Sequence, residues 1–211
     1  MDRKTVAPMT HEATVFIVDD DDAVRRFLTG LIRSIDLKVE AYASAQDFLD
    51  AYRPGRPGCL LLDVRMPGMS GLELQRELAE RAIALQVVIL TGHGNVPVAV
   101  QAMKAGAVDF IEKPFNNELL LDRIQRAVAQ SLRSDSAREA RDETLRRLDT
   151  LTRRERQVFE LVVGGETNKS IAHRLAISGK TVEIHRARVM RKMRARSLAA
   201  LVQMAVSLAD D

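Results

Sequence analysis

The architecture of the N-terminal part of the chain can be inferred from one stretch, Cys59-Leu60-Leu61-Leu62-Asp63-Val64-Arg65-Met66-Pro67-Gly68. Its four leading apolar residues show no two-residue alternation, which favours a strand buried on both faces of a parallel sheet. The run ends at Asp63, and Met66-Pro67-Gly68 has the composition of a turn that leaves this carboxylate projecting. An amphipathic segment at 72–81 follows, so the stretch predicts a strand-then-helix unit with an acid at the strand end.

Four further units of the same kind flank this one, two before it and two after it. Their apolar runs cover 15–18, 38–42, 87–90 and 108–111, and their amphipathic segments cover 23–34, 45–52, 97–105 and 118–132. Strand-then-helix units in succession predict an α/β domain with a doubly wound, five-stranded parallel sheet. We place this domain at residues 13–130.

Polar side chains stand where the predicted strands end. Asp19 and Asp20 follow the first strand, Asp63 the third, Thr91 the fourth and Lys113 the fifth. Because functional groups of parallel sheets collect at the carboxyl ends of the strands, we expect these side chains to share one crevice. Carboxylates in one crevice repel each other unless a cation neutralises them, and Mg²⁺ prefers oxygen ligands and often works beside phosphate. The sequence therefore predicts a magnesium site.

Asp63 is the best candidate for a reacting carboxylate, because it stands alone at its strand end. An aspartate can attack phosphorus when a metal and a cation stabilise the transferring group; Lys113 could supply that cation and Thr91 a hydroxyl donor. The acids at 19–22 could instead stabilise the N-terminus of a helix by complementing its dipole. We accept this role for Asp21 and Asp22, and it remains an alternative for Asp19 and Asp20. The Gly-His-Gly stretch at 92–94 matches no nucleotide-binding pattern and is interpreted as a flexible loop.

Over about residues 13–132, the chain resembles the receiver domain of bacterial response regulators. The resemblance rests on the blocks Val18-Asp19-Asp20, Leu62-Asp63-Val64-Arg65-Met66-Pro67-Gly68-Met69-Ser70-Gly71, Leu90-Thr91-Gly92-His93-Gly94 and Phe110-Ile111-Glu112-Lys113-Pro114-Phe115. It implies that Asp63 accepts a phosphoryl group from a phosphohistidine on a sensor histidine kinase. It also implies that Asp20, Asp63 and the backbone carbonyl of Arg65 hold Mg²⁺, with Asp19 assisting through water.

The same resemblance assigns the phosphate contact and the switch. Lys113 would pair with the phosphate, and the Lys113-Pro114 bond would be cis, as proline permits. The hydroxyl of Thr91 would move toward the phosphate while the ring of Phe110 turns inward behind it. Many receivers carry tyrosine at the position of Phe110, so here the switch would act by packing alone.

Charge divides the 211 residues into three parts. Residues 1–130 carry 15 Lys or Arg against 18 Asp or Glu, residues 131–150 carry 5 against 5, and residues 151–211 carry 12 against 6. The middle part keeps helix formers with almost nothing to bury, so we interpret 131–148 as a charged helical linker that either extends the fifth helix or frays. The basic part suggests a polyanionic partner, although a solvated basic face would carry the same charge.

Residues 149–211 are expected to form a small all-α domain with four helices at 153–163, 168–175, 179–193 and 198–208. Thr152 and Ser178 are suited to cap the first and the third of these, and Glu155 would complete a capping box with Thr152. The link at 176–178 has the length of the turn in a helix-turn-helix motif.

The third of these helices has the pattern of a DNA-recognition helix. On a helical wheel, Val182, Val189 and Met193 form a core face, while the opposite face mixes small, apolar and arginine side chains. Such a face suits a major groove, although a basic helix that is merely exposed to solvent would show the same pattern. The candidate DNA contacts are Asn168, Lys169, Ser178, Lys180, Thr181, Glu183, Ile184, His185, Ala187, Arg188 and Arg191.

This second domain resembles the LuxR-type DNA-binding domain, in the blocks Leu151-Thr152-Arg153-Arg154-Glu155-Arg156-Gln157-Val158, Asn168-Lys169-Ser170-Ile171-Ala172 and Thr181-Val182-Glu183-Ile184-His185-Arg186. A receiver followed by this domain is typical of the FixJ and NarL class, and the chain is most similar to the FixJ branch. Glu183 and Ala187 occupy groove positions where other members carry basic side chains, so the base preference does not transfer.

The expected function is that of a two-component response regulator that dimerises and binds double-stranded promoter DNA when Asp63 is phosphorylated. In the resembled family the dimer contact is the fourth helix with the fifth strand, here about 98–105 and 108–111, and RNA polymerase is a further partner. Beyond the Mg²⁺-dependent phosphorylation and dephosphorylation of the receiver, no enzymatic activity is expected. The alternatives are a constitutive DNA binder and a metal-dependent phosphohydrolase, which should carry Asp-x-Asp where this chain has Asp63-Val64-Arg65.

The expected location is the cytoplasm. Cys59 is the single cysteine and lies in an apolar run, which fits a reducing compartment. No apolar stretch approaches the ~18 residues of a membrane span, and residues 1–13 lack the apolar core of a signal peptide.

Overall fold

The computed structural model describes residues 13–92 and 96–209. These residues form two compact units, which divide between Asp135 and Ser136. Most of the loop expected at 92–94 lies outside the described residues, and so does the segment 1–12 that was expected to lack a signal peptide. No helix in the described part of the chain combines the length and the apolar character needed to cross a membrane.

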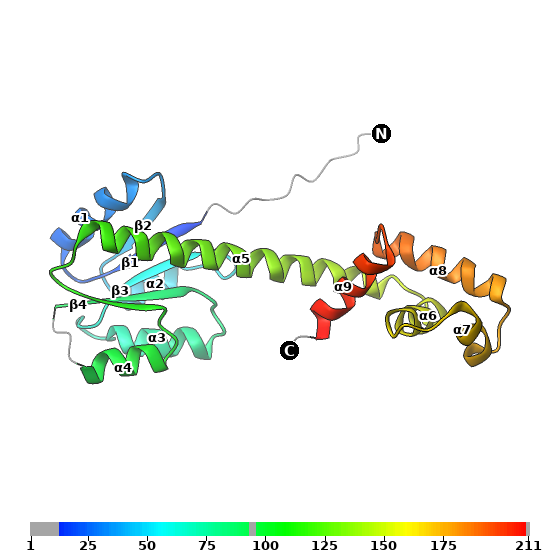
Figure 1. Cartoon of the computed structure of the whole chain (residues 1–211). Coiled ribbons are helices and arrows are strands. Elements are labelled where there is room, and N and C mark those ends of the chain that lie inside the picture. The colour runs from blue at the N-terminus through cyan, green and yellow to red at the C-terminus, as the bar shows by residue number, and fades with distance from the viewer. Residues whose placement is uncertain (1–12, 93–95, 210–211) are drawn as a thin grey trace. The chain divides into compact units, whose positions relative to one another are not determined.

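The first unit is a parallel sheet with helices on both faces (Figure 1). Its strand order is β2-β1-β3-β4-β5. The elements are β1 (Thr14–Val18), α1 (Asp22–Arg33), β2 (Lys38–Tyr42), α2 (Ala45–Ala51), β3 (Gly58–Asp63), α3 (Gly71–Glu80), β4 (Gln86–Thr91), α4 (Val96–Lys104), β5 (Asp109–Glu112) and the first part of α5 (Asn117–Asp149), which continues into the second unit. The doubly wound fold predicted from the sequence is confirmed, and only α5 departs from its predicted bounds by more than one residue.

The apolar run in β3 supplies both cores of this unit. Leu60 and Leu62 pack on one side of the sheet in a cluster with residues of α2, α3 and α4. Cys59 and Leu61 pack on the other side with residues of α1 and α5. Every residue of β3 is buried, which is why the strand lacks the alternation of a sheet with one wet face.

Residues 131–149 are helical as part of α5, which is the first of the two alternatives for this segment. They also bury more than the sequence suggested, since Ser131 and Thr144 are both buried. The hydroxyl of Ser131 accepts a hydrogen bond from the Gly58 N–H at 2.8 Å within the first unit. Arg147 instead donates to the carbonyl of Met193 at 3.2 Å within the second unit. The two ends of the charged segment therefore belong to different units.

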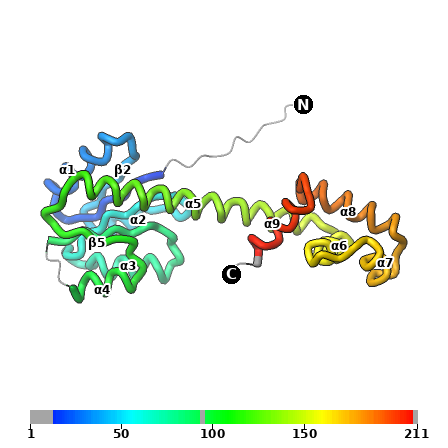
Figure 2. The backbone as a smooth tube through the Cα atoms, viewed as in Figure 1, coloured from blue at the N-terminus to red at the C-terminus, as the bar shows by residue number. Residues whose placement is uncertain are grey.

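The second unit contains α6 (Arg153–Val163), α7 (Asn168–Leu175), α8 (Gly179–Met193) and α9 (Leu198–Ala209), close to the predicted helices (Figure 2). Its core gathers side chains from all four, including Phe159, Ile171, Val189 and Leu201. Thr152 caps α6 in a capping box and Ser178 caps α8, both as predicted.

Candidate functional site

Strand pairing brings the predicted site residues to one edge of the sheet. The parallel register of β1, β3, β4 and β5 ends these strands at the same side. Asp19, Asp63 and Thr91 are buried there, with exposed fractions of 2%, 7% and 2%. Lys113 is half-buried beside them, and Asp20 is exposed. The strand ends therefore bring Asp19, Asp63, Thr91 and Lys113 to one edge of the sheet.

Lys113 is the centre of this cluster of side chains. Its Nζ donates to Asp19 Oδ2 at 2.6 Å and to Asp63 Oδ1 at 2.7 Å. The three residues come from the ends of different strands, and one ammonium group holds the two carboxylates together. One cation faces two anions, so the cluster keeps an excess negative charge in a poorly solvated place.

Burial and charge act in opposite directions on these groups. Burial raises the pKa of Asp19 above its ordinary value, and the hydrogen bond and charge of Lys113 only partly offset this. For Lys113, burial alone would lower the pKa, but the hydrogen bonds and charges of Asp19 and Asp63 outweigh it and raise the pKa. The amine therefore stays a cation at neutral pH, ready to pair with an anion.

The backbone after β3 fixes the carboxylate of Asp63. Its Oδ2 accepts a hydrogen bond from the Arg65 N–H at 2.6 Å. The Gly71 N–H closes the turn on the Val64 carbonyl at 3.0 Å, and α3 starts there with Ser70 as N-cap. A Cβ built on Gly71 would lie 2.1 Å from the Asp63 carbonyl oxygen, so only glycine fits. The segment that includes Met66-Pro67-Gly68 thus fixes the position of Asp63 at the end of β3.

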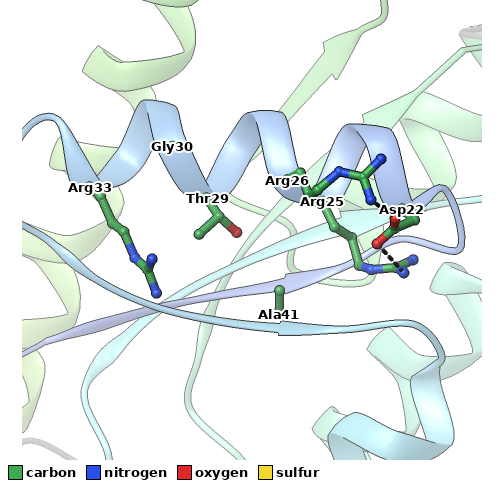
Figure 3. A pocket seen from close by; sticks show the side chains of 7 residues that line it. All are labelled: Asp22, Arg25, Arg26, Thr29, Gly30, Arg33 and Ala41. Atoms are coloured by element: carbon green, nitrogen blue, oxygen red, sulfur yellow. Dashed lines mark hydrogen bonds and ion pairs between the residues drawn. The ribbon is translucent and has the colours of Figure 1, made fainter.

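The acids that follow β1 divide into two roles. Asp21 is the N-cap of α1 and accepts from the Ala23 N–H at 2.8 Å, as expected for a helix start. Asp22, in the first turn, pairs with Arg25 and Arg26 (Figure 3). Arg25 Nη1 also donates to the Asp19 carbonyl oxygen at 2.7 Å, and this bond joins the start of α1 to the backbone that follows β1.

The oxygen atoms of this edge suit a hard cation. Among the residues that the structure describes, no three His, Cys, Asp or Glu side chains are gathered for metal binding. Lys113 pairs with Asp19 and Asp63, and Asp20 is exposed. The available donors are carboxylates and a main-chain carbonyl such as that of Arg65, and Mg²⁺ needs few protein ligands because it keeps several waters.

The predicted switch residues, Thr91 and Phe110, lie on the neighbouring strands β4 and β5. Thr91 is buried at the end of β4, and its carbonyl oxygen accepts from the Lys113 N–H at 2.7 Å. The Lys113-Pro114 peptide is cis, as the resemblance implied. Phe110 is partly buried and packs against the core cluster that includes Ala102 of α4. The ring therefore connects β5 to the side of the sheet where α4 lies.

α8 has two faces, as the helical wheel predicted. Val182, Val189 and Met193 are buried in the core of the second unit. The opposite face is exposed, and the exposed fraction of the Ile184 side chain reaches 47%. The other exposed residues of this face are Lys180, Glu183, Ala187, Arg188 and Arg191.

Some of the residues predicted to contact DNA form hydrogen bonds within the second unit. Ser178 Oγ accepts from the Thr181 N–H at 3.1 Å as the N-cap of α8. Asn168 Oδ1 accepts from Arg186 Nη1 at 2.8 Å, which ties α7 to α8. His185 is half-buried, and its Nδ1 has no hydrogen-bond partner among the described residues. Ser178 and Asn168 therefore already have structural contacts within the second unit.

Exposed cations of the second unit also lie outside α8. Lys169, one of the candidates, is exposed at the start of α7. Arg194 and Arg196 are exposed just beyond the end of α8 and were not among the candidates. The signal that could have found them is the continuation of the basic run past Arg191.

Comparison with known proteins identifies both units. Residues 15–125 match the response regulator receiver domain, and residues 149–205 match the luxR family of bacterial regulatory proteins. The chain is 47% identical over 207 residues to the transcriptional regulatory protein FixJ of Azorhizobium caulinodans, covering 96% of this chain and 98% of that protein. It is 48% identical over 195 residues to FixJ of Rhizobium meliloti, covering 92% and 95%. The solved structure of the response regulator StyR, at 44% identity, covers 92% of this chain and 98% of its own with a TM-score of 0.84.

The two matches coincide with the two compact units. The first contains the strands that carry Asp19, Asp63, Thr91 and Lys113, and the second contains α8. The relatives match nearly the whole chain with both units in the same order. The chain therefore belongs to the bacterial response regulators in which a receiver domain is followed by a LuxR-type DNA-binding domain.

Proposed function

We propose that this chain regulates transcription in response to phosphorylation of Asp63 by a sensor histidine kinase. The observation that carries the proposal is the position of Lys113, whose amine lies within hydrogen-bond distance of both Asp19 and Asp63. In the transfer, an Asp63 oxygen bonds to phosphorus as the phosphorus–nitrogen bond to the kinase histidine breaks. The electron pair stays on the imidazole nitrogen, which then takes a proton from solvent.

The residues around Asp63 have separate roles in this step. Asp20, Asp63 and the Arg65 carbonyl would hold Mg²⁺, with Asp19 assisting through water. When bound, the metal supplies positive charge against the phosphoryl oxygens. Lys113 pairs with a new phosphate oxygen. This chemistry modifies only the receiver itself, so we assign no activity on external substrates.

Phosphate at Asp63 would bias the switch formed by Thr91 and Phe110. A switch shifts only by the difference in contacts between its two states, and the phosphate offers the Thr91 hydroxyl a contact that is absent without it. Inward packing of Phe110 would then alter the α4–β5 surface, where Val100 and Met103 of α4 are already exposed. We propose this surface as the homodimer contact of the phosphorylated protein.

The second unit would read double-stranded promoter DNA through α8. Its exposed face would enter the major groove, with cations such as Lys180, Arg188 and Arg191 contacting bases or phosphates. The remaining candidates are Asn168, Lys169, Ser178, Thr181, Glu183, Ile184, His185 and Ala187. RNA polymerase is the proposed further partner, and the cytoplasm, where promoter DNA is found, is the proposed location.

The test is the variant Asp63→Asn, with Asp36→Asn as the matched control. Asp36 is exposed and has a positive φ that asparagine tolerates. With acetyl phosphate and Mg²⁺, wild type and control should gain one phosphoryl group by mass spectrometry, form dimers by light scattering and bind promoter DNA more tightly in footprinting. Asp63→Asn should show none of these gains.

Three outcomes would contradict the proposal in different ways. A phosphoryl group retained in Asp63→Asn would place the acceptor elsewhere. Equal promoter affinity with and without acetyl phosphate in wild type would favour a constitutive DNA binder. Steady release of phosphate from an added phosphomonoester would favour a phosphohydrolase.

A further inference from the structure

The last turn of α8 is fastened to the corner where α5 ends and α6 begins. Lys192 Nζ donates to the Thr150 carbonyl oxygen at 2.8 Å and to Glu155 Oε2 at 2.6 Å. On the neighbouring residue, the Met193 carbonyl accepts from Arg147 Nη1 at 3.2 Å. These bonds join parts of the chain that are far apart in sequence, and all lie within the second unit.

Glu155 is the fixed point of this arrangement. Its side chain is only 3% exposed, and the same Oε2 that binds Lys192 also accepts from the Thr152 N–H at 2.9 Å. The Thr152 hydroxyl in turn accepts from the Glu155 N–H at 3.3 Å. The hydrogen bond from Lys192 is the main reason why the pKa of Glu155 falls to about 2. One carboxylate thus closes the N-terminus of α6 and holds α8.

We propose that Arg147, Thr150, Glu155 and Lys192 form an anchor that positions α8 for sequence-specific DNA binding. The proposal rests on the proposed function of α8 as the recognition helix. The buried face of α8 is apolar, and apolar contacts are non-directional, so they allow the helix to slide or rotate slightly. Charge-assisted hydrogen bonds at its end are directional and fix its register. Base readout depends on such support, because contacting side chains must be held within about 0.5 Å.

The anchor also makes the last turns of α5 part of the DNA-reading unit. Arg147 and Arg146 both pair with Glu143, but only Arg147 reaches the Met193 carbonyl. The neighbouring Arg146 side chain is 68% exposed. Arg146 therefore has the same charge and the same Glu143 partner as Arg147, but it lacks the bond to Met193 and is more exposed, 68% against 22%, and it serves as the control.

Glu155→Gln separates positioning from electrostatics. The change removes a negative charge near a DNA-binding surface, and on electrostatic grounds it should leave non-specific affinity equal or higher. A positioning role predicts the opposite for the specific site. We expect specific affinity to fall about tenfold, within the range for one mismatched base pair, while affinity for a scrambled duplex does not fall.

The experiment compares a footprinted promoter duplex with a scrambled duplex of equal length, using the full-length phosphorylated protein. Glu155→Gln and Arg147→Ala should lower the ratio of specific to non-specific affinity about tenfold. Arg146→Ala should leave the ratio unchanged. Lys192→Met should lower the ratio, and Lys192→Arg should restore most of it. Circular dichroism melts define the temperature range in which every variant is folded, and affinities are measured there.

The possible outcomes separate a failure of the proposed anchor from a failure of the proposed function of α8 in DNA binding. If wild type prefers the promoter duplex but Glu155→Gln and Arg147→Ala keep its ratio, the anchor is wrong and the proposed function stands. If both affinities fall in parallel, the residues act on DNA attraction or folding and the anchor is again wrong. If wild type shows no preference for any duplex, the proposed function fails and the anchor fails with it.

Discussion

Lys113 shows how much one residue contributes to this protein. Its amine bridges Asp19 and Asp63, which are both almost fully buried. Lys113→Met would leave two carboxylates without their cation. We expect the free energy of unfolding of the first unit to fall by about 1–3 kcal/mol, the cost of buried polar groups that lose a charged partner.

Differential scanning calorimetry with and without millimolar Mg²⁺ checks this prediction. A divalent ion should recover part of the lost stability, because it can neutralise the same carboxylates. Lys104→Met, at an exposed lysine of α4, is the control and should change little. Equal unfolding temperatures for Lys113→Met and wild type would contradict the importance of the bridge.

Two glycines respond oppositely to the same substitution. A Cβ at Gly71 would meet the Asp63 carbonyl oxygen at 2.1 Å, whereas one at Gly30, inside α1, meets nothing within 4 Å. Gly71→Ala should therefore destabilise the first unit and slow phosphorylation, because it pushes on the backbone of Asp63. Gly30→Ala should stabilise that unit by about 0.5–1 kcal/mol, since alanine is the better helix former. Chemical denaturation curves would show both signs, and a stable, active Gly71→Ala variant would refute the close approach.

At the scale of one element, the start of α6 gives a pH dependence. The hydrogen bond from Lys192 lowers the pKa of Glu155 from 4.5 to about 2. A lowered folded-state pKa means that its stabilisation is complete above the unfolded value of 4.5 and is lost as the pH falls toward 2. Glu155→Gln should flatten the stability of the second unit over that acidic range, as measured by urea unfolding of residues 136–211. The same acid slope in both proteins would show that Glu155 is not the group responsible.

At the scale of the whole molecule, the two units have separate cores, and the end of α5 belongs to the second. A fragment of residues 136–211 keeps buried Thr144, partly buried Leu148 and the Arg147 bond to Met193, while a fragment of 149–211 loses all three. We expect the shorter fragment to be less stable by about 0.5–3 kcal/mol.

Thermal unfolding of the two fragments by circular dichroism tests this boundary. The longer fragment should melt at the higher temperature at equal concentration. Equal melting temperatures would show that residues 136–148 do not stabilise the second unit and act only as a linker, as the sequence alone suggested.

The sequence by itself determined the order and type of the elements and the residues at the strand ends. Apolar runs, helical periodicity and capping residues such as Thr152 and Ser178 are local signals, so they can be recognised without knowledge of the fold. The rule that functional groups collect at the carboxyl ends of parallel strands was enough to place Asp19, Asp63, Thr91 and Lys113 at one edge of the sheet.

Only the tertiary structure decided how those groups are paired. Strand register and side-chain direction place the amine of Lys113 between two carboxylates, whereas the expectation from the sequence paired it only with the phosphate. The bond of Lys192 to Glu155 and that of Arg147 to Met193 likewise join residues with no local signal in common. Such contacts depend on how distant elements pack, and a pattern along the chain carries no record of that geometry.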